Sequence, residues 1–258
     1  MPDGSSVSDG LRICALYPEV MNIYADRGNL AVLEQRCRWR DIPVSITAAS
    51  SGAAVDPDAF DLFYLGGGQD RDQELVAHDL VATKREALHA AAARGAVILG
   101  ICGGIQLLGQ HYELGDRTIP GLGLLDLHTV RSSGPRLIGN VAIEVQLEGE
   151  RPRVLAGFEN HGGRTMLGRA AKPLGRVLKG HGNDGQSGYE GARAGSVIGT
   201  YLHGPLLPKN VWFADWIITT ALGLPHGALA QLDDRLEDAA HAGARAAAGL
   251  PPTPSESR

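Results

Sequence analysis

Two patterns of apolar and polar residues alternate along the first half of the chain. Short apolar runs predict buried strands at residues 11–16, 44–47, 60–65 and 96–101. Between them, apolar side chains recur at helical spacing in three longer stretches, residues 22–39, 73–93 and 105–112. Strands that alternate with helices of this length are typical of βαβ units and of a mostly parallel sheet.

The pattern changes between about residues 119 and 201. Four short β-like runs separated by glycine-rich turns follow one another, at residues 124–130, 139–146, 175–178 and 196–201. A helical pattern returns at residues 209–222. We therefore expect an α/β fold of three layers, with an open, mostly parallel sheet and an antiparallel extension.

The ends of the chain differ in composition from its middle. Residues 1–10 and 241–258 are rich in Gly, Ala, Ser and Pro, so we expect flexible tails there. Residues 11–240 then form a single domain, since no internal repeat and no low-complexity insert interrupts them.

Composition narrows the class of protein. Of the 258 residues, 43% are hydrophobic and 21% charged, as in an ordinary soluble globule, and the net charge of -5 argues against nucleic acid as the main partner. No apolar stretch approaches the roughly 18 residues of a membrane span, and residues 1–10 do not resemble a signal peptide. Three cysteines without a CxxC pair exclude a disulfide framework and a four-cysteine zinc site. We expect a cytoplasmic protein without a metal site.

One cysteine stands where a nucleophile would stand. The apolar run at residues 96–101 leads directly into Cys102, which glycines flank, and a helical pattern follows. This G-x-C-x-G arrangement is the thiol counterpart of the nucleophile elbow of serine hydrolases. A position at a helix N-terminus is expected to lower the pKa of the Cys102 thiol. Cys14 and Cys37 lie in apolar patterns and are interpreted as inert core thiols.

His203 is the candidate base. It lies at the end of an apolar strand and just before a turn, and catalysis in open α/β sheets gathers at the carboxyl ends of strands. An imidazole there can take the thiol proton and return it to a leaving amine. The alternative is a turn histidine that only bonds to the backbone.

A glycine cluster at residues 66–68 follows another strand. Consecutive glycines expose backbone N–H groups, which is what an oxyanion hole requires. Gly67 and Gly68, together with the N–H of Gly103, are the candidate donors. The simpler interpretation, a strand-to-helix turn capped by Asp70, is compatible with this one.

Four motifs in order, from Gly66 to His203, resemble one family. Cys102 to Gln106 matches the CxGxQ elbow of class I (triad-type) glutamine amidotransferases. Residues 159–163 resemble the N-H-G segment of that family, and residues 199–204 resemble the G-T-Y-L-H-G signature of its cobyric-acid-synthase-like branch. The resemblance implies a flavodoxin-like fold and attack by Cys102 on the side-chain amide of glutamine.

The resemblance also implies which residues bind the substrate. Gln106 and the backbone of Gly162 and Gly163 would contact the bound glutamine. An arginine is expected to hold its α-carboxylate, because a guanidinium matches a carboxylate with two hydrogen bonds. Of Arg131 and Arg136 on the loop at residues 130–136, we favour Arg136, although a solvated loop arginine is the alternative. His161 belongs to the substrate segment and ranks behind His203 as the base.

Finer features, at residues 21–29, 159–165 and 204–210, resemble the glutaminase subunits of lipid II isoglutaminyl synthases. This resemblance implies a glutamine amidohydrolase that acts as one subunit of an amide-forming carbon–nitrogen ligase. Its ammonia would pass to a Mur-ligase-like synthetase (MurT type) in a heterodimer, which amidates D-glutamate of the peptidoglycan stem peptide. The sequence holds no GxxxxGK[ST] loop, so we expect no cofactor in this chain and ATP and magnesium in the partner.

One departure from the family pattern concerns the histidine. Most triad-type members read H-x-E, whereas this chain reads His203-Gly204-Pro205. A Cys–His dyad can work, because cysteine depends least on a strong base. Glu159 and Asp26 are two carboxylates that could orient the imidazole, and the third member stays open.

Three alternatives follow. The acceptor of ammonia could be another carboxylate, such as a corrinoid. The chain could be a cysteine peptidase or amidase, although the CxGxQ glutamine and the N-H-G segment argue against this. It could also be a non-catalytic regulatory subunit, as the missing glutamate suggests and the intact Cys102 and His203 oppose.

Overall fold

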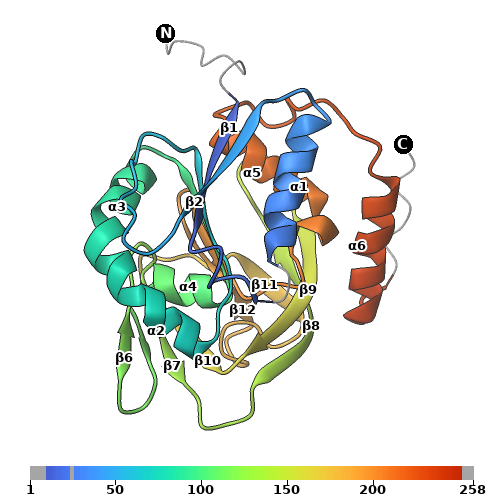
Figure 1. Ribbon diagram of the computed structural model, residues 1–258. Coiled ribbons are helices and arrows are strands. Elements are labelled where there is room, and N and C mark those ends of the chain that lie inside the picture. Colours follow the sequence, from blue (N-terminus) through green and yellow to red (C-terminus); the bar gives the residue numbers. More distant parts are fainter. Residues whose placement is uncertain (1–9, 24–25, 252–258) are drawn as a thin grey trace.

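A computed structural model describes residues 10–23 and 26–251. Its largest sheet has six strands in the order β13-β14-β4-β3-β1-β2 (Figure 1). All neighbours in this sheet pair in parallel except β13, which is antiparallel to β14. The strand bounds are β1 (Leu11–Leu16), β2 (Val44–Ala49), β3 (Leu62–Leu65), β4 (Val97–Ile101), β13 (Ala192–Ala194) and β14 (Val197–Thr200).

Helices cover both faces of this sheet. Figure 1 shows α1 (Arg27–Arg38) and α5 (Val211–Ala221) on one side, and α2 (Asp70–Asp79) and α3 (Arg85–Ala93) on the other. A π-helical turn (Leu80–Lys84) joins α2 to α3, so the predicted helix at residues 73–93 exists with an irregular middle. The α/β class with a parallel-rich sheet is confirmed.

The antiparallel part is organised differently from the prediction. Only β13 extends the large sheet, and the other strands form two sheets of four, in the orders β10-β7-β5-β6 and β12-β11-β8-β9. The first contains β5 (His111–Glu113), β6 (Thr118–Pro120), β7 (Leu127–Arg131) and β10 (Gly163–Leu167). The second contains β8 (Leu137–Val145), β9 (Arg153–His161), β11 (Gly175–Lys179) and β12 (Tyr189–Glu190).

Two helix boundaries also differ. The predicted helix at residues 105–112 is α4 (Gly103–Leu108), which ends because Gly109 adopts an extended conformation and the chain then enters β5. At the other end, α6 (Arg235–Ala247) runs through residues 241–247, which we predicted to belong to a flexible tail. Alanine has the highest helix propensity, and residues 239–248 are rich in it. Residues 1–9 and 252–258 of the two predicted tails lie outside the described part.

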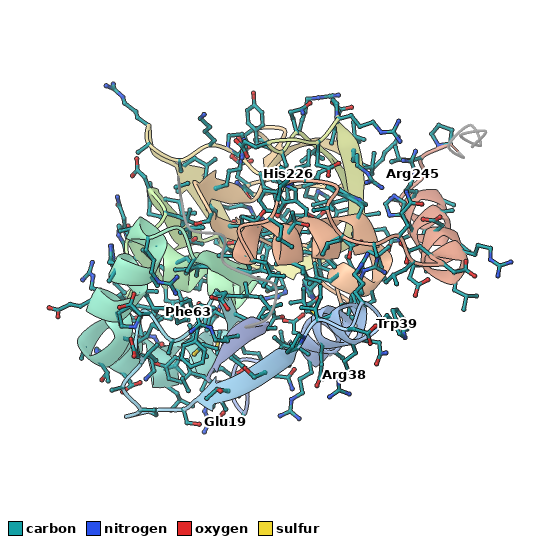
Figure 2. The ribbon with its side chains drawn as sticks, turned by 90° about the horizontal axis from the view of Figure 1, so that it is seen from above. Glu19, Arg38, Trp39, Phe63, His226 and Arg245 are labelled. Carbon is teal, nitrogen blue, oxygen red and sulfur yellow. The ribbon has the colours of Figure 1, made fainter. Side chains whose placement is uncertain are left out.

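The core of the large sheet fixes the place where chemistry can occur. Strands β3 and β4 are buried along their whole length, because helices cover both faces. Phe63 of β3 lies in the interior, whereas Arg38 and Trp39 lie at the outer edge of the molecule (Figure 2). No helix within the described ranges is long and apolar enough to cross a bilayer.

A buried arginine ties three segments together. The guanidinium of Arg36 on α1 donates to Asp215 of α5 at 2.6 Å and to Asp234, just before α6, at 2.7 Å. The Arg36 side chain is 1% exposed, so its positive charge depends on both carboxylates. Removing one member of a buried ion pair leaves an uncompensated charge and is strongly destabilising.

We expect Arg36→Ala to lower the free energy of unfolding by about 3–5 kcal/mol, because half-buried Asp234 loses its partner and Asp215 is left with Arg40. The measurement is urea unfolding followed by circular dichroism. Arg38→Ala is the matched control, since Arg38 is 62% exposed and, among the described residues, pairs only with Glu34 on the same helix. The control should change stability by less than about 0.5 kcal/mol, and equal effects of the two variants would contradict this account.

Candidate active site

Cys102 occupies a sharp turn between β4 and α4. Its φ of 52° lies in the left-handed region, which costs a residue with a side chain about 1–3 kcal/mol. The turn is held because the Cys102 N–H donates to the carbonyl of Thr200 at 2.8 Å, next to the parallel pairing of β14 with β4. A Cβ on Gly104 would lie 2.3 Å from the carbonyl oxygen of Leu65, so only glycine fits there. The elbow predicted from the sequence is present.

The electrostatic expectation for Cys102 was wrong in sign. Burial raises the pKa of the Cys102 thiol to about 12, and the negative charge of Asp26 acts in the same direction. The N–H of Gly103 favours the thiolate and lowers the pKa, but this contribution is smaller than that of burial. The N-terminus of α4 therefore does not offset the loss of water. The resting nucleophile is therefore a thiol.

His203 lies close beyond the end of β14. Its N–H donates to the carbonyl of Phe158 at 3.0 Å, and its own carbonyl accepts the N–H of Phe158 at 3.1 Å. Burial lowers the pKa of His203 to about 4, and the charges of Lys209 and Arg136 add to this effect. The imidazole is thus neutral at neutral pH and able to accept a proton. The structure brings Cys102 and His203 to the same edge of the large sheet.

The glycine cluster at residues 66–68 passes beside the nucleophile. The N–H of Gly67 donates to Asp26 Oδ2 at 2.7 Å, so this group does not point at a reacting atom as we predicted. Gly68 is placed differently, because a Cβ on Gly103 would lie 3.0 Å from the Gly68 nitrogen. The N–H groups of Gly68 and Gly103 therefore remain the candidate oxyanion donors, and Gly67 supports the loop.

A cavity of about 350 Å³ opens at this edge of the sheet. Its lining includes Cys102, Gly68, Gln106, Arg136 and Gly162. The volume suits a small molecule such as an amino acid. The loop, the elbow and the segment after β9 thus meet around a single space.

The two arginines of the loop at residues 130–136 behave differently. Arg131 forms an ion pair with Asp70 of α2. Arg136 donates to the side chain and the carbonyl of Asn160, both at 2.8 Å, and no carboxylate of the described residues pairs with it. Its positive charge on the cavity wall is therefore available to an anion, and its role in holding the α-carboxylate stays a prediction.

Gln106 is anchored through both atoms of its amide. Its Oε1 accepts a hydrogen bond from Gln73 at 2.8 Å, and its Nε2 donates to the hydroxyl of Tyr201 at 3.2 Å. Tyr201 is bonded in turn to Thr165 at 2.6 Å. Sequence reasoning assigned no role to Gln73 or Tyr201, although a polar residue on the buried face of α2, beside Val76 and Ala77, is a usable signal.

The two glycines of the N-H-G segment, Gly162 and Gly163, lie in different places relative to the cavity. Gly162 lies on the cavity wall, whereas Gly163 packs against Gln106, and a Cβ on Gly163 would lie 2.7 Å from Gln106 Nε2. The ring of His161 stacks on Tyr201 at 3.7 Å, and its Nδ1 bonds to the carbonyl of Gly163 at 2.9 Å. Burial lowers the pKa of His161 to about 4. This ring is fixed as part of the wall.

The two carboxylates considered for the orienting role are committed elsewhere. Glu159 accepts the N–H groups of His181 and Gly182, at 2.6 and 2.9 Å. Asp26 accepts the N–H of Gly67. Neither side chain shows a hydrogen bond to His203.

A third carboxylate, that of Glu190 in β12, bonds to the segment that leads into His203. It is fully buried and accepts the Tyr201 N–H at 2.6 Å and the hydroxyl of Thr200 at 2.9 Å. Glu190 therefore holds the residues that lead into His203. Sequence reasoning missed it, because nothing local marks a glutamate in a glycine-rich stretch as buried.

The comparisons with known proteins agree with one another. Residues 12–211 match the CobB/CobQ-like glutamine amidotransferase domain. The chain is 38% identical to the lipid II isoglutaminyl synthase (glutamine-hydrolyzing) subunit GatD of Streptococcus pneumoniae. The alignment spans 223 residues, which are 86% of this chain and 84% of the relative. It is 39% identical over 212 residues to subunit GatD of Staphylococcus aureus, with coverages of 82% and 84%.

More distant similarities are shorter or structural. A probable cobyric acid synthase of Methanothermobacter thermautotrophicus is 39% identical over 121 residues, which is 42% of this chain and 23% of the synthase. The solved structure of PurLQS from Thermotoga maritima superposes with a TM-score of 0.58 at 20% identity, and covers 83% of this chain and 96% of the other. The glutaminase domain of CTPS from Trypanosoma brucei superposes with a TM-score of 0.52 at 11% sequence identity. This superposition covers 86% of this chain and 98% of the other. These two structures support the fold.

The pKa of Glu190 predicts a pH-dependent stability. Burial raises this pKa to about 8, from the ordinary value of 4.5, so the folded protein binds a proton that the unfolded chain has lost in this range. Stability should therefore fall as the pH rises from about 4.5 to about 8. Glu190→Gln lacks this titration and should gain roughly 1–3 kcal/mol over the wild type between pH 5 and pH 8 in urea unfolding. Parallel pH profiles of the two proteins would show that Glu190 is ionised in the fold.

Proposed function

Because the chain belongs to the family of CobB/CobQ-like glutamine amidotransferases, we propose that it hydrolyses L-glutamine to glutamate and ammonia as one subunit of an amide-forming ligase. One observation carries this proposal. Cys102, on its elbow, and Arg136, which has no carboxylate partner among the described residues, share the wall of one cavity. A nucleophile and a carboxylate-binding cation on the wall of one cavity suit a free amino acid with a reactive side chain.

The first half of the reaction forms a thioester. Neutral His203 takes the proton of the Cys102 thiol as the sulfur attacks the side-chain carbonyl carbon of glutamine. The negative charge that develops on the carbonyl oxygen is stabilised by the N–H groups of Gly68 and Gly103. His203 then gives its proton to the departing nitrogen, and ammonia leaves.

The second half regenerates the enzyme. His203 accepts a proton from water, and the hydroxide attacks the thioester carbon through a second oxyanion at the same donors. The carbon–sulfur bond breaks, the sulfur takes back the proton, and glutamate is released. The resting state is again a neutral thiol beside a neutral imidazole, in agreement with the raised pKa of Cys102 and the lowered pKa of His203.

The proposed destination of the ammonia follows two of the relatives in sequence. The chain would pass ammonia to a Mur-ligase-like synthetase of the MurT type, which would hold ATP and magnesium and amidate D-glutamate of the peptidoglycan stem peptide on the cytoplasmic side. Support comes from two relatives named as subunit GatD, each matched over more than four fifths of both chains. A corrinoid acceptor is less well supported, since the cobyric acid synthase match spans 23% of that protein.

The test is the release of ammonia from L-glutamine by the purified chain, alone and with its Mur-ligase-like partner. We expect Cys102→Ala to abolish release. Arg136→Ala should lower kcat/KM about 10–100-fold, mainly through KM, because a charge-assisted bond to the α-carboxylate is lost. Cys14→Ala is the matched control, since this thiol is buried in β1 and should leave the rate unchanged.

Two results would contradict the proposal. One is the absence of glutamine hydrolysis from the folded chain even with its partner, which would favour a regulatory subunit. The other is full activity of Cys102→Ala, which would exclude the thioester route.

A further inference from the structure

Asp26 is a buried carboxylate that the proposed reaction does not use. It is 0% exposed and stands at the N-cap position of α1. An aspartate at this position ordinarily accepts an N–H of its own helix. No such bond is present, and Asp26 Oδ2 instead accepts the N–H of Gly67 at 2.7 Å, 41 residues along the chain. The side chain therefore serves the glycine loop and not its own helix.

The glycine loop is held at both polar groups of Gly67. While the N–H of Gly67 donates to Asp26, its carbonyl accepts the N–H of Ile23 at 3.0 Å. The preceding glycine is also fixed, because a Cβ on Gly66 would lie 2.3 Å from the carbonyl oxygen of Met21. The segment that leads into α1 thus holds the loop along its length.

Asp26 is separated from the nucleophile Cys102 by Gly67. A Cβ on Gly67 would lie 2.9 Å from Asp26 Oδ2 and 3.3 Å from the Cβ of Cys102, so Gly67 stands between the carboxylate and the nucleophile. The next residue, Gly68, has its nitrogen beside Gly103. The Gly67 carbonyl and the Gly68 N–H belong to one planar peptide, whose direction the bond from Ile23 sets, and the bond to Asp26 fixes the peptide that precedes it. With both peptides held, the direction of the Gly68 N–H is largely fixed.

We propose that Asp26 is the positioning residue of the oxyanion loop, which holds Gly67 so that the N–H of Gly68 faces the carbonyl oxygen under attack. The inference rests on the proposed glutaminase reaction and adds to it a residue that acts through the loop. Preorganised donors contribute most when their direction does not change during the reaction, and a bond to a buried carboxylate supplies that rigidity.

The contact also has an electrostatic consequence that a purely structural bond would not have. The charge of Asp26 raises the pKa of the Cys102 thiol, whereas the charge of Arg136 lowers it. The other titratable groups around Cys102 are the hydroxyls of Tyr112 and Tyr201, whose pKa values burial raises. The imidazoles of His161 and His203, whose pKa values burial lowers, also belong to this set. Asp70 lines the same cavity but forms an ion pair with Arg131. Asp26 is an anion at neutral pH, since burial raises its pKa to about 6 only.

Two substitutions separate the bond from the charge. Asp26→Asn keeps an oxygen that can accept the Gly67 N–H and removes the charge, whereas Asp26→Ala removes both. With the partner synthetase present, we expect Asp26→Ala to lower kcat about 30-fold or more with little change in KM, since one oxyanion donor is worth about 10²–10³ in kcat. Asp26→Asn should stay within about threefold of the wild type.

Two further measurements do not need glutamine turnover. Alkylation of Cys102 by iodoacetamide, followed by peptide mass spectrometry, should be faster in both variants, with its pH profile moved to lower pH. Amide hydrogen exchange at residues 66–68 should be faster in Asp26→Ala and near wild type in Asp26→Asn. Both measurements use the chain alone, so they distinguish a failure of this inference from a failure of the proposed glutaminase.

The control is Asp61→Asn. Asp61 also accepts a backbone N–H, that of Arg12 at 2.9 Å, but it precedes β3 at the end opposite the loop. It should change neither kcat nor the alkylation profile. If Asp26→Ala does not fold, Asp26→Ser replaces it, because its hydroxyl is too short to reach Gly67. Unchanged or raised kcat in the folded Ala or Ser variant, or an unchanged alkylation profile in Asp26→Asn, overturns the proposal.

Discussion

The parallel pairing of β14 with β4 is the constraint on which the candidate site depends. It places Thr200 beside Ile101, so that the carbonyl of Thr200 accepts the N–H of Cys102 immediately beyond the strand. One strand then carries the nucleophile and the other continues toward His203. Because β3 pairs on the other side of β4, the glycine loop that follows β3 reaches the same edge. Three segments that are far apart in sequence thus bring a thiol, an imidazole and backbone donors to one edge of the sheet.

Burial at this edge determines the protonation of the reacting groups. Loss of water raises the pKa of the Cys102 thiol and lowers the pKa of the His203 imidazole, so both are neutral before the substrate binds. In the proposed mechanism such a pair would transfer its proton as attack begins, and donors that are already oriented would stabilise the charge that forms. The rigidity of the loop therefore matters as much as the identity of the nucleophile.

The sequence predicted what local patterns encode. An apolar strand, a glycine-flanked cysteine and a histidine before a turn are each read from a few neighbouring residues, and the structure places Cys102 and His203 where the patterns indicated. The sign of the Cys102 pKa shift could not be read in this way, because desolvation depends on every segment that covers the thiol. The bond between Asp26 and Gly67, and the support that Glu190 gives to Thr200 and Tyr201, arise only when distant segments meet. The separation of the antiparallel strands into two small sheets is likewise a property of tertiary packing.

The central claim is that Cys102 attacks free glutamine in this cavity, and the glutamine affinity label 6-diazo-5-oxo-L-norleucine tests it most directly. Incubation of the folded chain with its partner, followed by peptide mass spectrometry, should show one covalent adduct on Cys102, and an excess of L-glutamine should prevent it. Labelling of Cys14 or Cys37, labelling that glutamine does not prevent, or no labelling of Cys102 would contradict the account.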